Sequence, residues 1–177
     1  MSVKIPQTLI NELIQLKIIS EADAEALKKT AQAGNKDFGR LLIEKNFISD
    51  KDLLTVESNL YRLPIVELDK IEFNKEILKE IAEDAVNFYK IVPFAKEGNT
   101  LMVGMINPED VGALEALKFI AEDKGYALEK FLIGYKDFDA LTKQYKTLTG
   151  EVGKALESLA EDLEVKEGPA VSIEEIT

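Results

Sequence analysis

The first third of the chain contains one sequence pattern twice, 29 residues apart. In LKIISEADAE and KNFISDKDLL, two apolar residues precede Ser20 and Ser49, and an acidic residue follows each serine three positions later. A serine followed in this way is typical of a helix N-terminus, and apolar residues recur on both sides at helical spacing. Each copy therefore predicts a helix-turn-helix unit. One hairpin cannot bury its apolar face alone, so two stacked copies, about four helices, are predicted for residues 1–62.

Residues 63–148 have a different texture, which predicts a small α/β sandwich. Gly98-Asn99 separates two apolar runs and is a strong β-hairpin signal. Pro93 lacks an amide donor, so it places the first strand at an edge of the sheet or turns that position outward. The run that begins at Leu101 is apolar on both faces and predicts a central strand.

The other elements of this region follow from caps and apolar spacing. Strands are predicted at 63–68 and 128–134, which makes a sheet of three to four strands. Helices are predicted at 75–81, from Asn107 or Asp110 to Gly125, and from Asp137 onward. The acidic pairs Glu109-Asp110 and Glu122-Asp123 are expected on the solvated surface. Aromatic side chains are expected in the core at Tyr61, Phe88, Tyr89, Phe94 and Phe119.

The C-terminal part predicts an amphipathic helix at 149–164 and a flexible acidic linker at 165–177. Four apolar residues stand at helical spacing: Val152, Leu156, Leu159 and Leu163. The remaining residues are polar and contain Gly168-Pro169. A chain that ends in a linker is expected to be part of a longer protein. The predicted fold class is thus α+β, with a helical repeat, a sandwich, a helix and a linker.

The composition excludes several classes of function. There is no cysteine and no histidine, so nucleophile–histidine catalysis is excluded and the commonest metal ligand is missing. With 33 acidic and 22 basic residues the formal charge is −11, which disfavours nucleic-acid binding. No apolar run is long enough for a membrane span, and no signal peptide is recognisable. We expect a cytoplasmic protein with no catalytic residue, no metal and no cofactor of its own.

One stretch, TGEVGKALES, superficially resembles a phosphate-binding P-loop. Gly150 and Gly153 are separated by two residues rather than four, and Ala155 stands where a hydroxyl would hold magnesium. The stretch is therefore interpreted as the start of a helix, and no Walker motif is found.

Two further stretches carry a family resemblance: LYRLPIVEL, which begins at Leu60, and YKIVPFAKEGNTLMVGMINPED, which begins at Tyr89. With the helical repeat they make Pro6–Leu148 resemble the N-terminal domain of type II secretion and type IV pilus assembly ATPases, the GspE/PilB group that includes the MshE N-terminal module. The resemblance implies a non-catalytic adaptor that docks the ATPase motor to the cytoplasmic part of a membrane platform protein, at the inner face of the membrane. ATP and magnesium would belong to a motor domain outside this chain.

Some members of the family bind cyclic di-GMP through a doubled motif that begins Arg-Leu-Gly and has a second Gly further on. Here Thr8 and Asp37 stand at the two Arg positions, and Lys17 and Asn46 stand at the second Gly positions. The charge-assisted contacts that arginine makes to phosphate are thereby lost, so we expect negligible binding. If cyclic di-GMP nevertheless binds, the resemblance implies these contacts: Leu9, Lys17, Gln32, Phe38, Gly39 and Arg40.

The first repeat also offers a candidate surface for the partner protein. Its apolar stripe consists of Leu9, Ile10, Leu13, Leu16 and Ile18. Apolar residues rimmed by charges such as Glu12 and Lys17 are typical of a protein interface. Packing against the second repeat or the sandwich is the alternative, because helical apolar stripes usually face a core. Two alternatives to the adaptor role also stay open: a cyclic di-GMP-sensing module of the same ATPase class, and a stand-alone signalling protein built on this domain.

Overall fold

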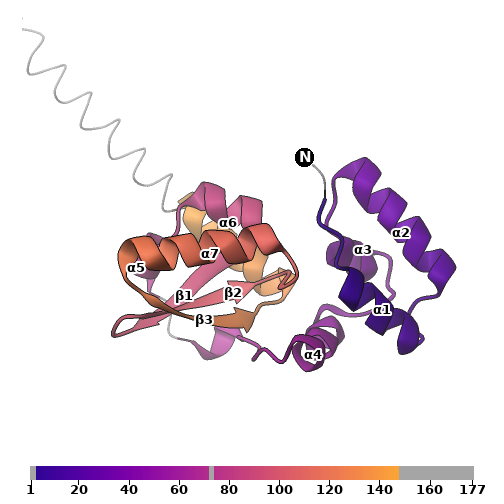
Figure 1. Ribbon diagram of the computed structural model, residues 1–177, viewed down its shortest axis with the longest axis horizontal. Helices are drawn as coiled ribbons and strands as arrows, with labels where there is room; N and C mark the ends of the chain where they lie inside the picture. The colour runs from indigo at the N-terminus through magenta and orange to yellow at the C-terminus, as the bar shows by residue number, and fades with distance from the viewer. Residues whose placement is uncertain (1–2, 72–73, 148–177) are drawn as a thin grey trace, which may run out of the picture. The chain divides into compact units, whose positions relative to one another are not determined.

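The computed structural model describes residues 3–71 and 74–147, and its contacts divide the chain into two compact units, Met1–Leu141 and Thr142–Thr177. The first unit begins with the helices α1 (Gln7–Gln15), α2 (Glu21–Gly34), α3 (Phe38–Glu44) and α4 (Asp50–Tyr61), drawn in indigo to purple in Figure 1. Of the second unit, residues 142–147 are described and are helical. The predicted α+β class and the four N-terminal helices are confirmed.

The repeat is visible in the backbone as well as in the sequence. Ser20 and Asp23 form a complete capping box at α2, and the Ser49 side chain accepts a hydrogen bond from the Asp52 amide at α4. The turns between the helices match too, since Lys17 and Asn46 both have φ of 61°. The second Gly of the family motif therefore falls on a left-handed turn, a conformation that glycine adopts without strain.

The sheet follows α5 (Lys75–Leu78) and α6 (Glu83–Tyr89), and consists of β1 (Ile91–Glu97), β2 (Thr100–Met105) and β3 (Ala127–Leu132). Among the described residues it has three strands in the order β1-β2-β3. A two-residue turn at Gly98 and Asn99 joins β1 to β2 in antiparallel fashion, as predicted. α7 (Val111–Lys124) then crosses over so that β3 runs parallel to β2.

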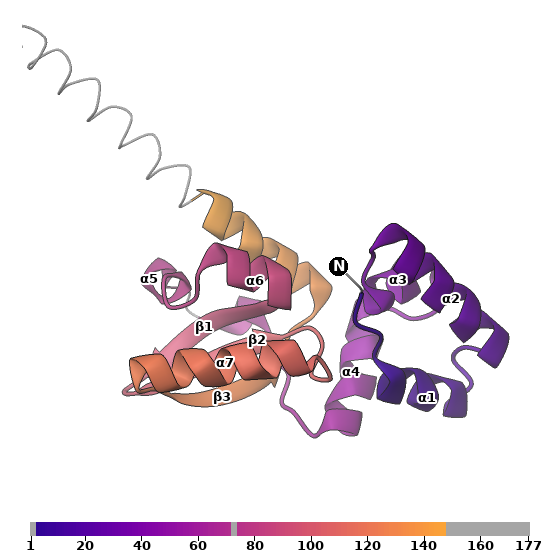
Figure 2. The ribbon, with the colours of Figure 1, turned by 45° about the horizontal axis from the view of Figure 1, so that its top comes forward.

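The two faces of the sheet have different environments. Leu101, Val103 and Met105 of β2 are fully buried. Leu128 of β3 pairs with Leu101 and lines a groove together with Leu117 of α7, so this is the face that α7 covers. Helices α6 and α7 contact each other, and Figure 2 shows them beside the sheet. The opposite face carries Phe94, Met102 and Phe131 and borders a second groove.

Several predicted elements are corrected by the structure. The strand predicted at 63–68 is reduced to one bridge, Ile65 to Leu132, because Pro64 has no amide donor and the chain turns into a 3-10 helix at Leu68–Lys70. The helix predicted at 75–81 ends at Leu78. α6 was not predicted, because it is short, its N-cap Ala82 offers no capping side chain, and it shows little apolar periodicity.

Of the five aromatic residues predicted in the core, two are exposed and two, Tyr61 and Tyr89, are half-buried. The exposed fraction is 53% for Phe88 and 70% for Phe119, since both lie on the outer faces of their helices, whereas Phe94 is buried. The domain boundaries at 62, 148 and 164 stay predictions. The amphipathic helix at 149–164 and the linker at 165–177 lie outside the described residues.

Candidate functional site

The first motif copy begins at the N-terminus of α1, and a carboxylate from a distant segment occupies that end. The amides of Thr8 and Leu9 donate to Glu109 oxygens at 3.0 and 3.1 Å, and the Tyr61 hydroxyl donates to the same carboxylate. Burial acts to raise the pKa of Glu109, but these three donors outweigh it, and the pKa is lowered. Glu109 therefore serves α1 as the N-terminal cap that its own N-cap residue, Pro6, does not provide.

The second motif copy begins at α3, where Asp37 replaces the motif arginine. An Asp37 oxygen accepts from the Gly39 amide at 3.0 Å and from the Tyr135 hydroxyl. A Cβ atom at position 39 would lie 3.1 Å from ring carbons of Tyr135 and closer still to its hydroxyl. The retained motif glycine thus allows the close approach of a tyrosine of the chain itself.

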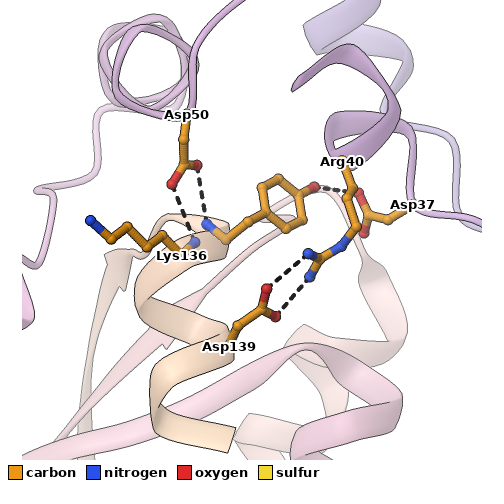
Figure 3. A network of polar contacts seen from close by, with 6 residues as sticks. Asp37, Arg40, Asp50, Lys136 and Asp139 are labelled. Carbon is orange, nitrogen blue, oxygen red and sulfur yellow. Dashed lines mark hydrogen bonds and ion pairs between the residues drawn. The ribbon is translucent and has the colours of Figure 1, made fainter. Parts of the chain in front are cut away.

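Arg40, the cation that could substitute for the lost motif arginines, is held in an ion pair. Its two terminal nitrogens donate to the two oxygens of Asp139, each at 2.9 Å, and the guanidinium lies 4.8 Å from the Tyr135 ring centre (Figure 3). The hydrogen bonds to Asp139 raise the pKa of Arg40 above its usual value. In this bidentate ion pair the guanidinium uses the two N–H donors that would otherwise bind a phosphate.

Asp50, in the first turn of α4, caps a helix that is remote in sequence. Its oxygens accept from the amides of Tyr135 and Lys136 at 3.1 and 3.2 Å. Figure 3 shows Asp50 next to Lys136. The helix predicted to start at Asp137 therefore starts at 135. Gly134 is required just before it, because a Cβ there would lie 2.8 Å from the Asp50 carboxylate.

Glu57 of α4 is the buried acid among these groups. Its exposed fraction is 6%, and burial raises its pKa to about 8, with further contributions from the charges of Asp37, Asp50 and Glu109. Glu57 is therefore largely protonated at neutral pH. Four carboxyl groups thus surround one junction, where three accept hydrogen bonds from distant segments and the fourth holds a proton.

The predicted ligand residues lie on different elements of the helical repeat. Phe38, Gly39 and Arg40 lie together at the start of α3 and contact or adjoin the Tyr135 region. Leu9 is buried in another helix, while Lys17 and Gln32 are exposed elsewhere on α1–α2. The arrangement suits structural cohesion better than recognition of a phosphorylated ligand, since carboxylates stand at or beside both helix N-termini.

The predicted docking stripe is only partly accessible. Leu9, Ile10 and Leu13 are 2%, 0% and 0% exposed, because they form the core of the helical repeat. Leu16 is 49% exposed and Ile18 is half-buried. We therefore limit the candidate docking residues of the first repeat to Leu16 and Ile18.

Sequence reasoning missed the residues that define this junction. Glu109 was expected on the solvated surface, which is wrong because it accepts bonds from α1 and Tyr61. Asp37, Asp50, Tyr135 and Asp139 pair across 85 or more residues, and no local pattern marks such pairs. Within residues 3–71 and 74–147, no cluster of three potential metal ligands occurs, and no helix is long and apolar enough to cross a membrane.

Comparison with known proteins adds family information to this geometry. A family model described as the MshEN domain matches residues 61–151, just over half of the chain. The type IV pilus assembly ATPase PilB of Myxococcus xanthus (strain DK1622) is 24% identical over 168 residues, which cover 93% of this chain and 29% of PilB. PilB of Pseudomonas aeruginosa is 22% identical over 176 residues, which cover 92% of this chain and 31% of that protein.

Two solved structures share the fold. The structure of MshE with cdg has a TM-score of 0.60 at 24% identity, and the match covers 77% of this chain and 97% of that one. The N-terminal domain of XpsE has a TM-score of 0.57 at 16% identity, covering 81% and 98%. The chain spans less than a third of the length of the two pilus ATPases.

Proposed function

Because the chain belongs to the MshEN domain family, we propose that it is the non-catalytic adaptor domain of a type II secretion or type IV pilus assembly ATPase. In this role it docks the motor to the cytoplasmic part of a membrane platform protein and recruits it to the inner face of the membrane. The observation that carries the proposal is the family match, together with alignments that use nearly all of this chain and less than a third of each PilB.

The contacts of the first unit support a docking role over a catalytic one. Asp37, Arg40 and Asp50 of the repeat bind residues 135–139, and Glu109 binds α1. These polar side chains are thus engaged in holding segments of the chain together. We propose that ATP and magnesium act only in a separate motor domain.

The test is binding of the chain to the cytoplasmic domain of a platform protein from a secretion or pilus system, measured by isothermal titration. Leu16→Asp is expected to weaken the affinity at least tenfold, because it places a charge in an exposed apolar contact. Gln15→Asp, one exposed position away, adds the same charge and is expected to bind normally. Absence of binding to platform domains of both systems would overturn the proposed role. Equal affinity of the two variants would place docking outside the first repeat.

The second candidate function, sensing of cyclic di-GMP, has weaker support, and we propose that this chain does not perform it. Both motif arginines are replaced, and Arg40 is paired with Asp139. The ligand in the MshE structure belongs to that protein. Titration of cyclic di-GMP into the chain decides the matter, as developed in the Discussion.

A further inference from the structure

The outer edge of β3 has backbone groups without a strand beside them. In a strand, alternate residues direct their N–H and C=O groups to opposite neighbours. The amides of Ala127 and Ile133 donate toward the β2 side, whereas Leu132 exchanges bonds with the segment at 64–66 on the outer side. The backbone N–H and C=O groups of Leu128 and Lys130 therefore face the outer side of the sheet, as those of Leu132 do. In the described part of the chain, backbone pairing on this outer edge occurs only at Leu132.

An apolar groove lies against this open edge on the α7 face of the sheet, lined by Leu114, Leu117, Tyr126 and Leu128. On the opposite face a second groove, lined by Ile71, Phe94 and Met102, reaches β3 at Phe131. An added strand would direct alternate side chains into the two grooves, as in recognition by strand addition.

A second copy of the chain is a poor occupant of this edge. If two copies pair antiparallel with Leu128 of one opposite Lys130 of the other, the two Glu129 side chains face each other. If the two Lys130 residues pair with each other, two positive charges face each other, and the added strand meets the segment at 64–66. The register centred on Leu128 needs the Tyr126 amide, which already donates to Ala121. A formal charge of −11 on each copy adds repulsion.

The charge on the Glu129 face of the edge favours a basic residue there, whereas the α7 groove carries Lys118 and Lys130 beside Glu122. Glu129 pairs with Met102 in the sheet register, so its side chain lies on the face of the second groove. The second groove is lined by Glu67 and Glu97, with Lys70 paired to Glu67. A positive side chain opposite Glu129 would gain a favourable charge contact on this face.

We propose that the open edge of β3 is a docking strand that pairs through its backbone with an extended, basic segment of a partner protein. The segment has apolar residues that face the α7 groove and lysine or arginine residues that face Glu129. This inference rests on the proposed adaptor role, to which it adds a second contact surface besides Leu16 and the chemistry of the partner segment.

The test is amide hydrogen exchange, followed by NMR on the full chain. Two probes are used: the platform protein's cytoplasmic domain, and a short end-blocked peptide of alternating valine and lysine. Strand addition is expected to slow exchange at Leu128 and Lys130 about tenfold, with little change at Glu129 and Phe131, whose amides face β2. A peptide of alternating valine and glutamate is the matched control and is expected to have no effect.

Variants separate backbone pairing from side-chain contact. Lys130→Pro removes an outward amide and is expected to abolish the protection at Leu128, whereas Lys130→Ala keeps the amide and the protection. Circular dichroism checks that Lys130→Pro folds. If it does not, Glu129→Lys decides, because it should weaken lysine-peptide binding at least tenfold without altering the backbone.

Each outcome distinguishes this inference from the proposed function. Binding of the platform domain without protection of these two amides overturns the inference and leaves the adaptor role intact. Protection by the lysine peptide without binding of the platform domain supports the docking strand and overturns the adaptor role. Protection by neither probe, or equal protection by the glutamate peptide, overturns the inference.

Discussion

Replacement of Glu57 by glutamine should remove a pH-dependent loss of stability. The Glu57 carboxyl has an ordinary pKa of 4.5 and a folded pKa of about 8, raised by burial and then by Asp37, Asp50 and Glu109. Between these two pH values the folded chain holds a proton that the unfolded chain has released. The stabilisation linked to this proton is therefore complete below pH 4.5 and is lost as the pH rises through about 8.

The magnitude follows from linkage. One released proton lowers the free energy of unfolding by up to about 1.4 kcal/mol per pH unit, so about 2.5 units, from pH 4.5 to pH 7, amount to about 3.5 kcal/mol at most. Glutamine has nearly the same shape and does not titrate. Glu57→Gln should therefore be more stable than the wild type by about 2–3 kcal/mol at pH 7, and by less than about 1 kcal/mol at pH 4.5.

The assay is urea unfolding of both proteins at several pH values from 4.5 to 8, with the free energy extrapolated to water. The difference between the two proteins isolates Glu57, because the other carboxylates titrate in both. Glu122→Gln, on the exposed face of α7, makes the same substitution at the surface and should shift stability by less than about 0.5 kcal/mol at every pH. A Glu57→Gln difference that does not change with pH would refute the reasoning.

Three further predictions concern the motif positions. Gly39→Ala should cost about 1–3 kcal/mol in thermal or urea unfolding, because the added methyl overlaps the buried Tyr135, whereas Gly34→Ala meets only ordinary contacts and should be near neutral. Lys17→Gly should stabilise the fold by up to about 1 kcal/mol, since position 17 is left-handed; an equal or lower melting temperature would contradict this. Cyclic di-GMP should bind more weakly than roughly 100 μM, because the missing contacts to motif arginines are worth about 1.5–3 kcal/mol each; low-micromolar calorimetry would contradict this and implicate Arg40.

The local part of the fold follows from the sequence because its signals act over a few residues. Ser20 caps α2 through an amide three positions away, and the turn at Gly98 is specified by the two residues between the paired strands. The order of the strands is also indicated by local features, since Pro93 is compatible with an edge strand and an all-apolar run favours a central one. In each case the residue type alone decides between few backbone conformations.

The candidate site depended instead on residues far apart in the chain. Apolar spacing predicted a stripe from Leu9 to Ile18 but not which part faces outward, and packing buried Leu9, Ile10 and Leu13 while it left Leu16 exposed. The same limit explains Phe119, whose aromatic character predicted burial. Periodicity identifies an apolar face, whereas burial depends on what packs against it.

The sequence by itself therefore determined the helical repeat, the hairpin, the family and the loss of the motif arginines, because each is a matter of residue type at short spacing. Only the tertiary structure decided that Glu109 caps α1, that Asp50 starts the helix at 135, that Glu57 keeps a proton and that β3 has an open edge. These features arise between segments about 50 to 100 residues apart, where the pairing is selected by the packing of the whole core and not by any local preference.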